Sequence, residues 1–349
     1  PGCKVGAGHL RFRHLCAGTD IQTIPGVFEG ACMEEKISVI LVNYNGKQYN
    51  DACINSVLNS TVAAQIQVVV VDNASTDGSL QKLRDKWGTD GRLHVIALEE
   101  NFGFSRANNE GIRWSIEQGI KYFLLLNNDT EIEPDAIGLM MEYHRKTGRI
   151  VVPKILYADR RDTVWCAGGS FTPVIRKAIQ RGLNQKDDGQ PGQRMGNDAR
   201  YSKSGRCQFA NGCAVFLSRG IVERVGYLDE RFFLYYEDTE YSMRAAVRGV
   251  EIGYCAQAVV YHKVNGSTGG NGKPANAYYI TRNWLLCNSI HMRGRKHVNG
   301  QFVLFFIYFI CNRAAWFFIW LAQGKWGMCT AQIRGIRDFF CKKWGRSPA

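Results

Sequence analysis

Residues 68–78 read Val-Val-Val-Val-Asp-Asn-Ala-Ser-Thr-Asp-Gly, a β-branched run that stops at an acid and passes directly into turn residues. Four consecutive valines are typical of a strand that is buried on both faces of a parallel sheet. Asp72 would then lie at the carboxyl end of that strand. Ligands of open α/β sheets bind in the crevice outside these ends. The stretch therefore predicts a parallel sheet with an acid placed for a ligand.

Strands and helices alternate on both sides of this stretch. Apolar runs at 36–42, 93–98 and 122–126 predict three further strands, and the segments at about 48–59 and 79–87 predict helices between them. Such alternation indicates βαβ units. We therefore predict an α/β fold with a mostly parallel sheet flanked by helices.

Polar turns follow two more of these strands. The first strand ends in Asn43–Gly46 and the last in Asn127–Thr130. A hard divalent cation needs oxygen ligands, and a diphosphate needs a cation to offset its charge, which makes the turn with Asp129 a candidate ion site. The alternative is that this turn caps a helix that starts near Pro134, since Asn, Asp and Thr are all good N-cap residues.

Composition fits a globular protein of 349 residues, with 45% apolar residues, in one large or two ordinary domains. Apolar residues recur with no clear period in residues 1–35, and we treat this segment as an N-terminal extension. The twelve cysteines form no Cys-x-x-Cys pair and no zinc spacing. We therefore expect reduced thiols in a cytoplasmic compartment.

The net charge of +13 is concentrated near the C-terminus. From Arg282 to Ala349 there are eleven lysines and arginines and one acid, Asp338. This segment also contains an unbroken apolar run, Phe302–Cys311, which argues against nucleic-acid binding. An anionic membrane surface accounts for both features. Residues 296–349 are thus predicted to be a basic, aromatic helical region.

The apolar segment Phe302–Ala322 is long enough to span a membrane, but Asn312 and Arg313 lie at its middle. A central arginine costs roughly 2.5 to 3.5 kcal/mol on insertion scales. We therefore favour helices that lie in the inner membrane interface with tryptophans at headgroup level and basic side chains against lipid phosphates. A homodimer interface would use the same aromatic residues, and the two interpretations stand side by side. The side chains concerned are Trp316, Trp320, Trp326, Arg334, Arg337, Lys342, Lys343 and Arg346.

Seven motifs in a fixed order resemble those of the family 2 inverting glycosyltransferases with the GT-A fold, and most of all the rhamnosyltransferase branch. They lie within residues 36–295, which we therefore assign to a GT-A domain. An ordered set is far more specific than any single motif. The motifs are Asn43–Gly46, Val71–Gly78, Asn101–Gly111, Leu125–Thr130, Phe232–Arg244, Val260–Ser267 and Tyr278–Asn283.

The resemblance implies roles for the strand-end residues. Asp72 would pair with a ring N–H of the nucleotide base. Asn127 and Asp129 fall on the first and last positions of the family's Asp-x-Asp, where the first meets the ribose and the last the metal. Asn127 departs from that pattern and brings no charge, so one carboxylate of this motif would face Mg²⁺ or Mn²⁺. Arg106 is a candidate for the phosphates and equally a solvated helix residue. The full set of implied nucleotide-sugar contacts is Asn43, Tyr44, Asp72, Asn101, Arg106, Asn127 and Asn128.

Glu237 and Asp238 are the candidates for a general base. An inverting transfer is a single in-line displacement, so one carboxylate must remove the acceptor hydroxyl's proton opposite the leaving diphosphate. By resemblance the base is Asp238, with Glu237 and Arg244 as secondary candidates. The alternative is that both acids only stabilise the N-terminus of a helix.

His262 ends an apolar run and precedes a glycine-rich loop at 265–272. A lone histidine is more often structural. The loop is of a kind that closes over a diphosphate, and by resemblance His262 contacts the metal or phosphate. Between 160 and 210 we expect a long polar loop that separates strands at about 165–171 and 207–217.

The sequence therefore predicts an inverting, metal-dependent transferase that moves L-rhamnose from dTDP-L-rhamnose to a glycan or polyprenyl-linked acceptor in cell-surface polysaccharide synthesis. It would lie on the cytoplasmic face of the cell membrane. The alternatives are a family 2 transferase for a UDP- or GDP-sugar and a noncatalytic nucleotide-sugar or lipid-binding protein. A dinucleotide-dependent oxidoreductase is disfavoured because no Gly-x-Gly-x-x-Gly follows the first strand.

Overall fold

The sheet begins with the alternation that the sequence predicts. The computed structural model describes residues 35–173, 175–187, 200–264, 273–293 and 300–347. The expected extension therefore lies outside the described residues except for Glu35, and the loop 265–272 lies outside them entirely. The elements of the first half are β1 (Ile37–Asn43), α1 (Asn50–Leu58), a 3₁₀ turn (Ala63–Gln65), β2 (Ile66–Asp72), α2 (Ser79–Trp87), β3 (Leu93–Ala97), α3 (Phe104–Glu117), β4 (Tyr122–Asn127), β5 (Thr130–Ile132) and α4 (Ala136–Thr147).

The second half adds strands to the same sheet and ends in three helices. Its elements are β6 (Ile150–Tyr157), β7 (Thr163–Cys166), β8 (Gly169–Phe171), β9 (Ala178–Gln180), β10 (Gln185–Lys186), β11 (Gly205–Cys207), β12 (Ala214–Ser218), α5 (Arg219–Val225), α6 (Glu237–Val247), β13 (Ile252–His262), α7 (Pro274–Arg293), α8 (Gly300–Ala322) and α9 (Trp326–Phe340).

The strands that lead into the polar turns pair in parallel. Its order is β10-β7-β6-β12-β4-β1-β2-β3, and β1 pairs in parallel with both β2 and β4. The register sets Asn43 opposite Asp72 and Val42 opposite Asn127. Three polar strand ends therefore meet at one edge. The α/β class predicted from the sequence is confirmed.

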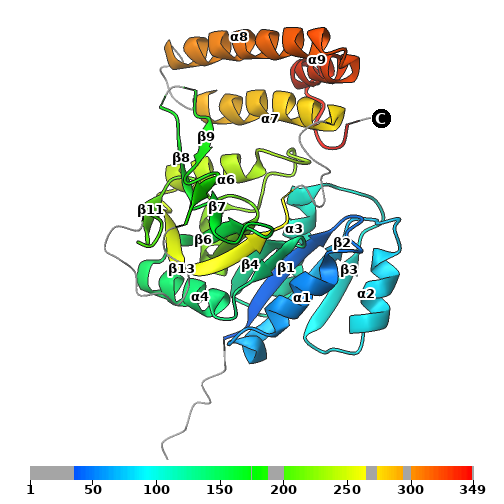
Figure 1. The fold of residues 1–349 in the computed structure, drawn as a ribbon, viewed down its shortest axis with the longest axis vertical. Helices are drawn as coiled ribbons and strands as arrows, with labels where there is room; N and C mark the ends of the chain where they lie inside the picture. The colour runs from blue at the N-terminus through cyan, green and yellow to red at the C-terminus, as the bar shows by residue number, and fades with distance from the viewer. Residues whose placement is uncertain (1–34, 174, 188–199, 265–272, 294–299, 348–349) are drawn as a thin grey trace, which may run out of the picture. The chain divides into compact units, whose positions relative to one another are not determined.

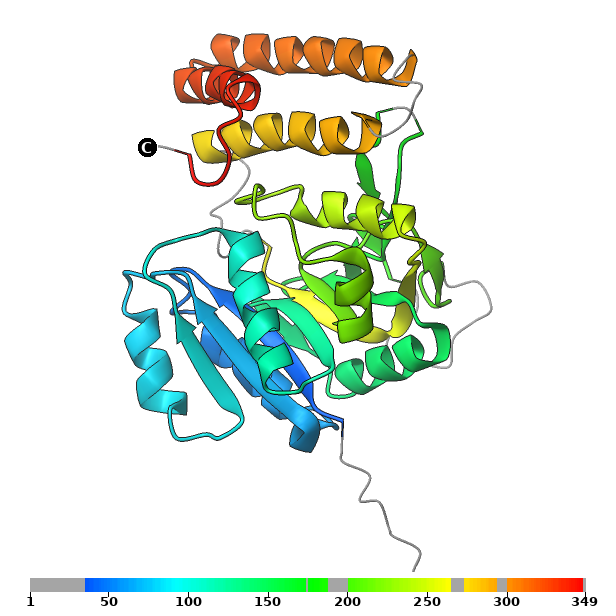
Figure 2. The same ribbon diagram turned by 180° about the vertical axis from the view of Figure 1, so that it is seen from behind.

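Both faces of the sheet are covered, as the valine run predicts. Val68 and Val70 belong to a core cluster that also contains residues of α1, α2 and α4, whereas Val69 and Val71 belong to a second cluster with residues of α3, α5 and α6. Figure 1 shows α1 before one face of the sheet, and Figure 2 shows α3 before the other. All four valines are fully buried, and each contributes about 1.5–3 kcal/mol relative to exposure.

The segment between 160 and 210 is more ordered than the sequence suggests. Instead of one long loop, it contains β8 and β9, which pair antiparallel as a separate two-stranded sheet, and β10, which pairs with β7. These strands have two or three residues each, too few for a visible alternation of apolar and polar positions. The residues 188–199 lie outside the described part.

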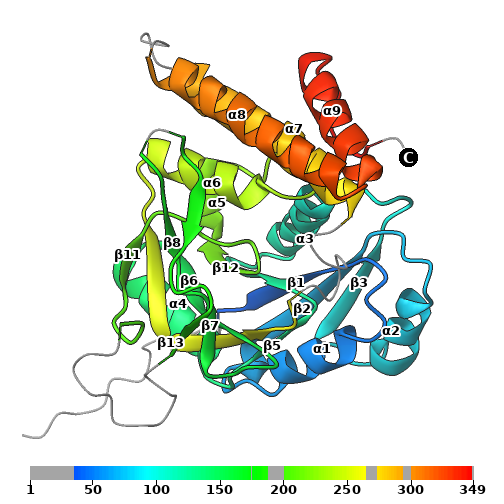
Figure 3. The same ribbon diagram turned by 45° about the horizontal axis from the view of Figure 1, so that its top comes forward.

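Three helices follow β13 in the chain. Figure 3 shows α8 lying over α7, and α9 packs against both. Arg313, at the middle of α8, faces α7, where it donates a hydrogen bond to Thr281 Oγ1 (3.3 Å) and lies over the ring of Trp284. The outer surface of α8 is apolar, with exposed Val303, Leu304, Ile307, Ile310, Trp316, Phe318 and Ile319.

Close packing of α3 on the sheet requires a glycine. A β-carbon at position 111 would lie 2.5 Å from Cγ2 of Ile40 on β1, whereas one at position 220 on α5 would meet open space. We predict that Gly111→Ala lowers the free energy of unfolding by about 1–3 kcal/mol, because α3 must shift away from the sheet. Gly220→Ala, the matched control, should leave stability unchanged or raise it slightly. Urea unfolding of both variants would measure this, and equal midpoints would contradict the packing argument.

Candidate active site

Asn43 is the centre of the polar network at the carboxyl edge of the sheet. Its side chain is fully buried. The amide nitrogen donates to Asp72 Oδ1 (2.6 Å) and also lies within hydrogen-bond distance of Ser79 Oγ (2.9 Å). Its amide oxygen accepts from Asn50 Nδ2 (2.9 Å) and Asn128 Nδ2 (3.2 Å). One side chain therefore ties together the ends of β1, β2 and β4.

Asp72 is fixed in orientation by this network. Besides Asn43, its carboxylate accepts the backbone N–H of Ser75 (3.0 Å), which closes the turn after β2. The next residue, Asn73, donates to the carbonyl of Gly103 (3.2 Å) and accepts from the N–H of Phe102 (2.9 Å). The side chain of Asn73 thus holds the turn after β2 against the turn before α3 with two hydrogen bonds.

In the Asn127–Asp129 turn, Asn128 and Asp129 contact different groups. Asn128 is buried and donates to Asn50 Oδ1 (2.8 Å), so it belongs to the network around Asn43. Asn127 is half-buried at the end of β4. The turn leads into β5, and α4 begins only at Ala136 with Asp135 as its N-cap residue. The helix-capping alternative for this turn is therefore wrong.

Asp129 and His262 lie together because of strand pairing. β13 pairs antiparallel with β5, which sets His262 opposite Thr130, the residue after Asp129. His262 Nε2 lies 3.2 Å from Asp129 Oδ1, and both side chains are buried. The ring of Trp165 and the imidazole pack in a T-shaped arrangement with 4.5 Å between their centroids. The sheet register thereby brings together a carboxylate and an imidazole that are 133 residues apart in the chain.

This pair fits a hard divalent cation. Mg²⁺ is commonly held by one or two protein ligands together with substrate phosphate oxygens and water. Among the described residues no group of three or more His, Cys, Asp or Glu side chains gathers, so phosphate and water would have to complete the shell. Burial raises the pKa of the nearby Cys53 thiol to about 12 and raises that of Cys213 well above its ordinary value. Both stay protonated, which makes them poor ligands for a soft metal.

Asp238 lies in the first turn of α6, and its carboxylate accepts several hydrogen bonds. Its Oδ2 accepts the N–H of Gly212 (3.2 Å), and its Oδ1 accepts the N–H (2.6 Å) and hydroxyl (3.1 Å) of Thr239. Burial raises the pKa of Asp238, while these hydrogen bonds oppose the rise. A carboxylate that accepts three hydrogen bonds is favoured in its charged form.

Glu237 has the opposite environment. It is buried, and its Oε2 has no hydrogen-bond partner among the described residues. Burial, and next the charge of Asp238, raise the pKa of Glu237 to about 8. The pair can therefore hold one negative charge on Asp238 while Glu237 stays protonated, which is how neighbouring carboxyl groups take different roles.

A short segment before β12 connects Asp238 to the Asn127–Asp129 turn. Gly212 donates to Asp238, and the carbonyl of the next residue, Cys213, accepts the N–H of Asn127 (2.9 Å). A β-carbon on Gly212 would be 3.5 Å from that of Asp238. Two consecutive residues just before β12 therefore link Asp238 to the Asn127–Asp129 turn.

The chain immediately before Asp238 is conformationally strained. Tyr235 and Tyr236 both have positive φ (67° and 72°), a conformation that non-glycine residues rarely adopt. Asn283 on α7 is fully buried and donates to the carbonyls of Leu234 and Tyr235 (2.9 Å each). Asn283, Gly212 and Asn50 were given no role from the sequence, because nothing local to them signals contact with a distant segment.

The remaining sequence-predicted residues occupy more varied positions. Tyr44 is 40% exposed beside the network. Asn101 accepts the N–H of Gly103 (2.9 Å), and Arg106 lies 3.8 Å over the ring of Phe102. Arg244 pairs with Glu240 (2.7 Å) and donates to the carbonyls of the last residue of α5 and of Tyr227. Its contacts join α5 to α6.

Comparison with known proteins agrees with this architecture. The family model described as "Glycosyl transferase family 2" matches residues 38–203. The matched region of the chain belongs to glycosyltransferase family 2. It therefore shares the family's activity, the transfer of a sugar.

Two curated relatives and one solved structure illustrate the similarity. The low-salt glycan biosynthesis hexosyltransferase Agl10 of Haloferax volcanii is 29% identical over 66% of this chain and 68% of its own length. The dTDP-rhamnosyl transferase RfbF of Shigella flexneri is 26% identical over 74% and 82%. A crystal structure of GalNAc-T7 with UDP, GalNAc and Mn²⁺ superposes with a TM-score of 0.57 at 15% identity, over 74% of this chain and about half of that one (48%). This last similarity shows the GT-A-like fold.

The raised pKa of Glu237 generates a prediction about stability. The folded protein holds this proton up to about pH 8, whereas an unfolded chain releases it near pH 4.5. Stability should therefore fall as pH rises through this window, by up to about 1.4 kcal/mol per pH unit. Glu237→Gln, which mimics the protonated acid, should remove much of this slope.

Urea unfolding at pH 5.5 and pH 8.5 would measure the effect. The variant should match the parent at the lower pH and exceed it at the higher one. Glu142→Gln, on the exposed surface of α4, is the control and should keep the parental pH slope. A Glu237→Gln variant with the parental slope would contradict the protonated state.

Proposed function

We propose that this family 2 enzyme is an inverting rhamnosyltransferase, which moves L-rhamnose from dTDP-L-rhamnose to a hydroxyl of a glycan or polyprenyl-linked acceptor in cell-surface polysaccharide synthesis. The relative RfbF, whose name gives dTDP-rhamnosyl transfer, supports the donor. A UDP- or GDP-sugar is the alternative donor. The proposal rests mainly on one observation, the short link through Gly212 and Cys213 between Asp238 and the Asn127–Asp129 turn.

The proposed reaction is a single displacement. The sugar donor would lie along the carboxyl edge of the sheet, with its base at Asp72 and its ribose at Asn127. Asp238 takes the proton of the acceptor hydroxyl as that oxygen attacks the anomeric carbon. The bond between the anomeric carbon and the diphosphate oxygen breaks at the same time, and the diphosphate leaves with the electron pair on the opposite face.

Charge at the leaving group needs compensation. Asp129 and His262 would hold Mg²⁺ or Mn²⁺, which when bound offsets the negative charge of the departing diphosphate. Protonated Glu237 keeps a second negative charge away from Asp238, so that the base faces the acceptor as a lone carboxylate. The paired turns after β2 and before α3 restrict the position of the base and ribose, which favours an aligned attack.

A donor screen tests this proposal. We predict that the protein hydrolyses dTDP-L-rhamnose slowly in the presence of Mn²⁺, that a chelator abolishes the reaction, and that UDP- and GDP-sugars react less. Asp238→Asn should reduce transfer to an added acceptor by at least a hundredfold, within the usual contribution of a general base. Binding of dTDP by calorimetry should remain within a factor of two.

The control for this variant is another aspartate. Asp85→Asn, at an exposed position of α2, removes the same charge at a residue that has no part in the site and should keep full activity. Parental transfer by Asp238→Asn would refute the assignment of the base. Binding of dTDP without turnover of any sugar by the parent protein would favour the noncatalytic alternative.

We also propose that α8 and α9 attach the enzyme to the cytoplasmic surface of the membrane. By length and composition α8 would suffice to cross a membrane, with a mean hydropathy of 1.9, and 17% of its apolar window is buried. Because Arg313 faces α7, the charge that disfavours insertion is removed from the outer surface. Basic residues of α9 would meet lipid phosphates. A homodimer through α8 is the competing arrangement.

Vesicle binding separates these two arrangements. We predict that the protein cosediments with vesicles of phosphatidylglycerol and that the double variant Ile307→Glu/Phe318→Glu loses most of this binding, because two charges would enter the interface. Val247→Glu, at an exposed apolar position on α6, is the control. A parental dimer that dissociates in the double variant, without vesicle binding in either, would favour the homodimer.

A further inference from the structure

The motif Tyr278–Asn283 lies on α7, outside the sheet whose edge carries the nucleotide-sugar residues. Thr281, Arg282 and Asn283 are each fully buried in it. A buried guanidinium is costly unless its N–H groups are hydrogen-bonded, and the same holds for a buried carboxamide. The acceptors of Arg282 and Asn283 therefore indicate what this motif does.

Asn283 holds the chain just before α6. Its Nδ2 donates to the carbonyls of Leu234 and Tyr235 (2.9 Å each). A carboxamide nitrogen has two N–H bonds, one for each of these carbonyls. The next residue, Tyr236, is the N-cap residue of α6, and Asp238 lies in the first turn of that helix. Asn283 thereby restrains the point from which α6 begins.

Arg282 sets the direction of the Asn283 carboxamide. Its Nε donates to Asn283 Oδ1 (2.9 Å). Because a guanidinium has donors only, the atom of Asn283 that faces it must be the oxygen, and the nitrogen is turned toward the carbonyls before α6. The two neighbouring side chains therefore act as a pair.

The outer end of the Arg282 guanidinium is bound to the segment 343–345, which follows α9. Nη1 donates to the carbonyl of Gly345 (2.9 Å) and lies 3.4 Å from the carbonyl oxygen of Lys343. Nη2 donates to the carbonyl of Arg231 (3.4 Å), which also accepts the N–H of Gly345 (3.4 Å). Arg282 therefore joins the segment after α9 to the segment that leads to α6.

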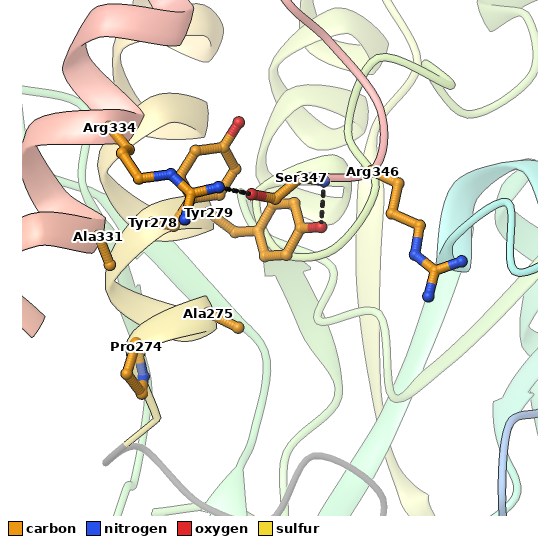
Figure 4. Close-up of a pocket in the computed structure, with 8 residues that line it drawn as sticks. All are labelled: Pro274, Ala275, Tyr278, Tyr279, Ala331, Arg334, Arg346 and Ser347. Atoms are coloured by element: carbon orange, nitrogen blue, oxygen red, sulfur yellow. Dashed lines mark hydrogen bonds between the residues drawn. The ribbon is translucent and has the colours of Figure 1, made fainter. Parts of the chain in front are cut away.

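The two tyrosines of the motif hold α9 and the residues after it against α7. The Tyr278 hydroxyl accepts a hydrogen bond from Arg282 Nη1 (3.3 Å) and donates one to the buried Asp338 on α9 (2.9 Å). The Tyr279 hydroxyl accepts the N–H of Ser347 (2.9 Å). Figure 4 shows both tyrosines on α7 and the hydrogen bond from Ser347. The position of Arg282 is thus tied to the C-terminal helices.

The segment 231–235 is held through its carbonyls by distant parts of the chain. Two residues at the start of α3 donate to the carbonyls of Phe232 and Phe233 (2.7 and 2.8 Å). Arg282 and Asn283 donate to the carbonyls on either side of these. All the carbonyls of this segment therefore accept hydrogen bonds from α3 or α7. Surrounding contacts of this kind are what a strained backbone requires.

We propose that Arg282 and Asn283 are positioning residues for Asp238, and that the segment 343–345 acts on the base through them. The inference rests on the proposed function for the role of Asp238 as base. Both side chains act on Asp238 through the backbone before α6 rather than by contact with the substrate. A displacement of about 1 Å in a reacting group can cost on the order of a hundredfold in rate.

Hydrolysis of dTDP-L-rhamnose with Mn²⁺ tests this role, with water in place of the acceptor and at a temperature where circular dichroism shows every variant to be folded. Asn283→Ala should lower kcat at least tenfold and leave KM for the donor within twofold, because the nucleotide-sugar residues lie on other elements.

Asn288→Ala is the matched control for Asn283→Ala. Asn288 is equally buried on α7 but donates to the carbonyl of Trp284 in its own helix (3.1 Å). This variant should keep kcat within twofold of the parent. A similar loss of kcat in both variants, or parental kcat in Asn283→Ala, would overturn the proposal.

Arg282→Lys tests the other member of the pair. It keeps the charge but loses the planar fork that reaches Asn283 and Gly345 together. We therefore expect kcat to fall at least threefold with an unchanged KM. Arg149→Lys, which changes a guanidinium paired with Glu251 (2.9 Å), is the control and should keep the parental kcat. Parental kcat in Arg282→Lys would refute the role of Arg282.

A pair of glycine variants tests the segment after α9 without changing α7. Gly345 and Gly324 both have positive φ (75° and 67°), and a β-carbon at either position would meet no atom within 4 Å. Valine strains the backbone at both, but Gly345 accepts from Arg282 whereas Gly324 lies in the turn between α8 and α9. Gly345→Val should lower kcat at least threefold and Gly324→Val less than 1.5-fold. Equal kcat in the two variants would contradict a role for segment 343–345.

Amide exchange gives a readout that needs no substrate. The N–H of Gly212 donates to Asp238 Oδ2 (3.2 Å), so its exchange with solvent, followed by NMR, reports whether the carboxylate stays in place. It should exchange at least tenfold faster in Asn283→Ala and at the parental rate in Asn288→Ala, while the amides of β12 keep their rates in both. An unchanged Gly212 rate in Asn283→Ala would overturn the proposal.

The two readouts separate this inference from the proposed function. If the parent hydrolyses no nucleotide sugar but the Gly212 amide responds as expected, the proposed function fails and the link from α7 to Asp238 stands. If the parent hydrolyses a nucleotide sugar and Asn283→Ala hydrolyses it equally fast, the transfer stands and the positioning role is refuted.

Discussion

The buried side chain of Asn43 is the interaction on which the candidate active site depends. A single carboxamide offers both donors and an acceptor, so it can satisfy Asp72 on one side and Asn50 and Asn128 on the other. An aspartate here would face Asp72 across 2.6 Å, and a leucine would leave several buried polar groups unpaired, each at a cost of about 1–3 kcal/mol. The parallel register of β1 with β2 and β4 places this one side chain where it can serve all three strand ends.

The sheet could be predicted from the sequence because its signals are local. The valine run and the alternation of strands with helices depend on neighbouring residues, and the strand-end positions of Asp72 and Asp129 follow directly from them. The closeness of His262 to Asp129 follows from the pairing of β5 with β13, which local patterns do not reveal. The same holds for Asn283 and Gly212, whose partners lie 26 or more positions away.

Short strands, and the direction in which a polar side chain of a helix points, were harder to predict from the sequence. β8 and β9 have three residues each, and their pairing replaces what reads as a polar loop. Arg313 was an argument against membrane insertion from sequence alone, because its direction could not be known. Its contact with Thr281 and Trp284 turns it inward, so the outer surface of α8 remains apolar in spite of a charge at its middle.

The pair of left-handed tyrosines has a consequence for how this enzyme could have diversified. Tyr235 and Tyr236 hold a conformation that costs free energy by itself, and the hydrogen bonds from Asn283 on α7 help to maintain it. The helix after the sheet domain is thereby part of the scaffold of the candidate active site. Exchange of the C-terminal helices between relatives would accordingly have to leave α7 with the sheet domain, since a junction placed before residue 274 would separate a strained segment from the residue that restrains it.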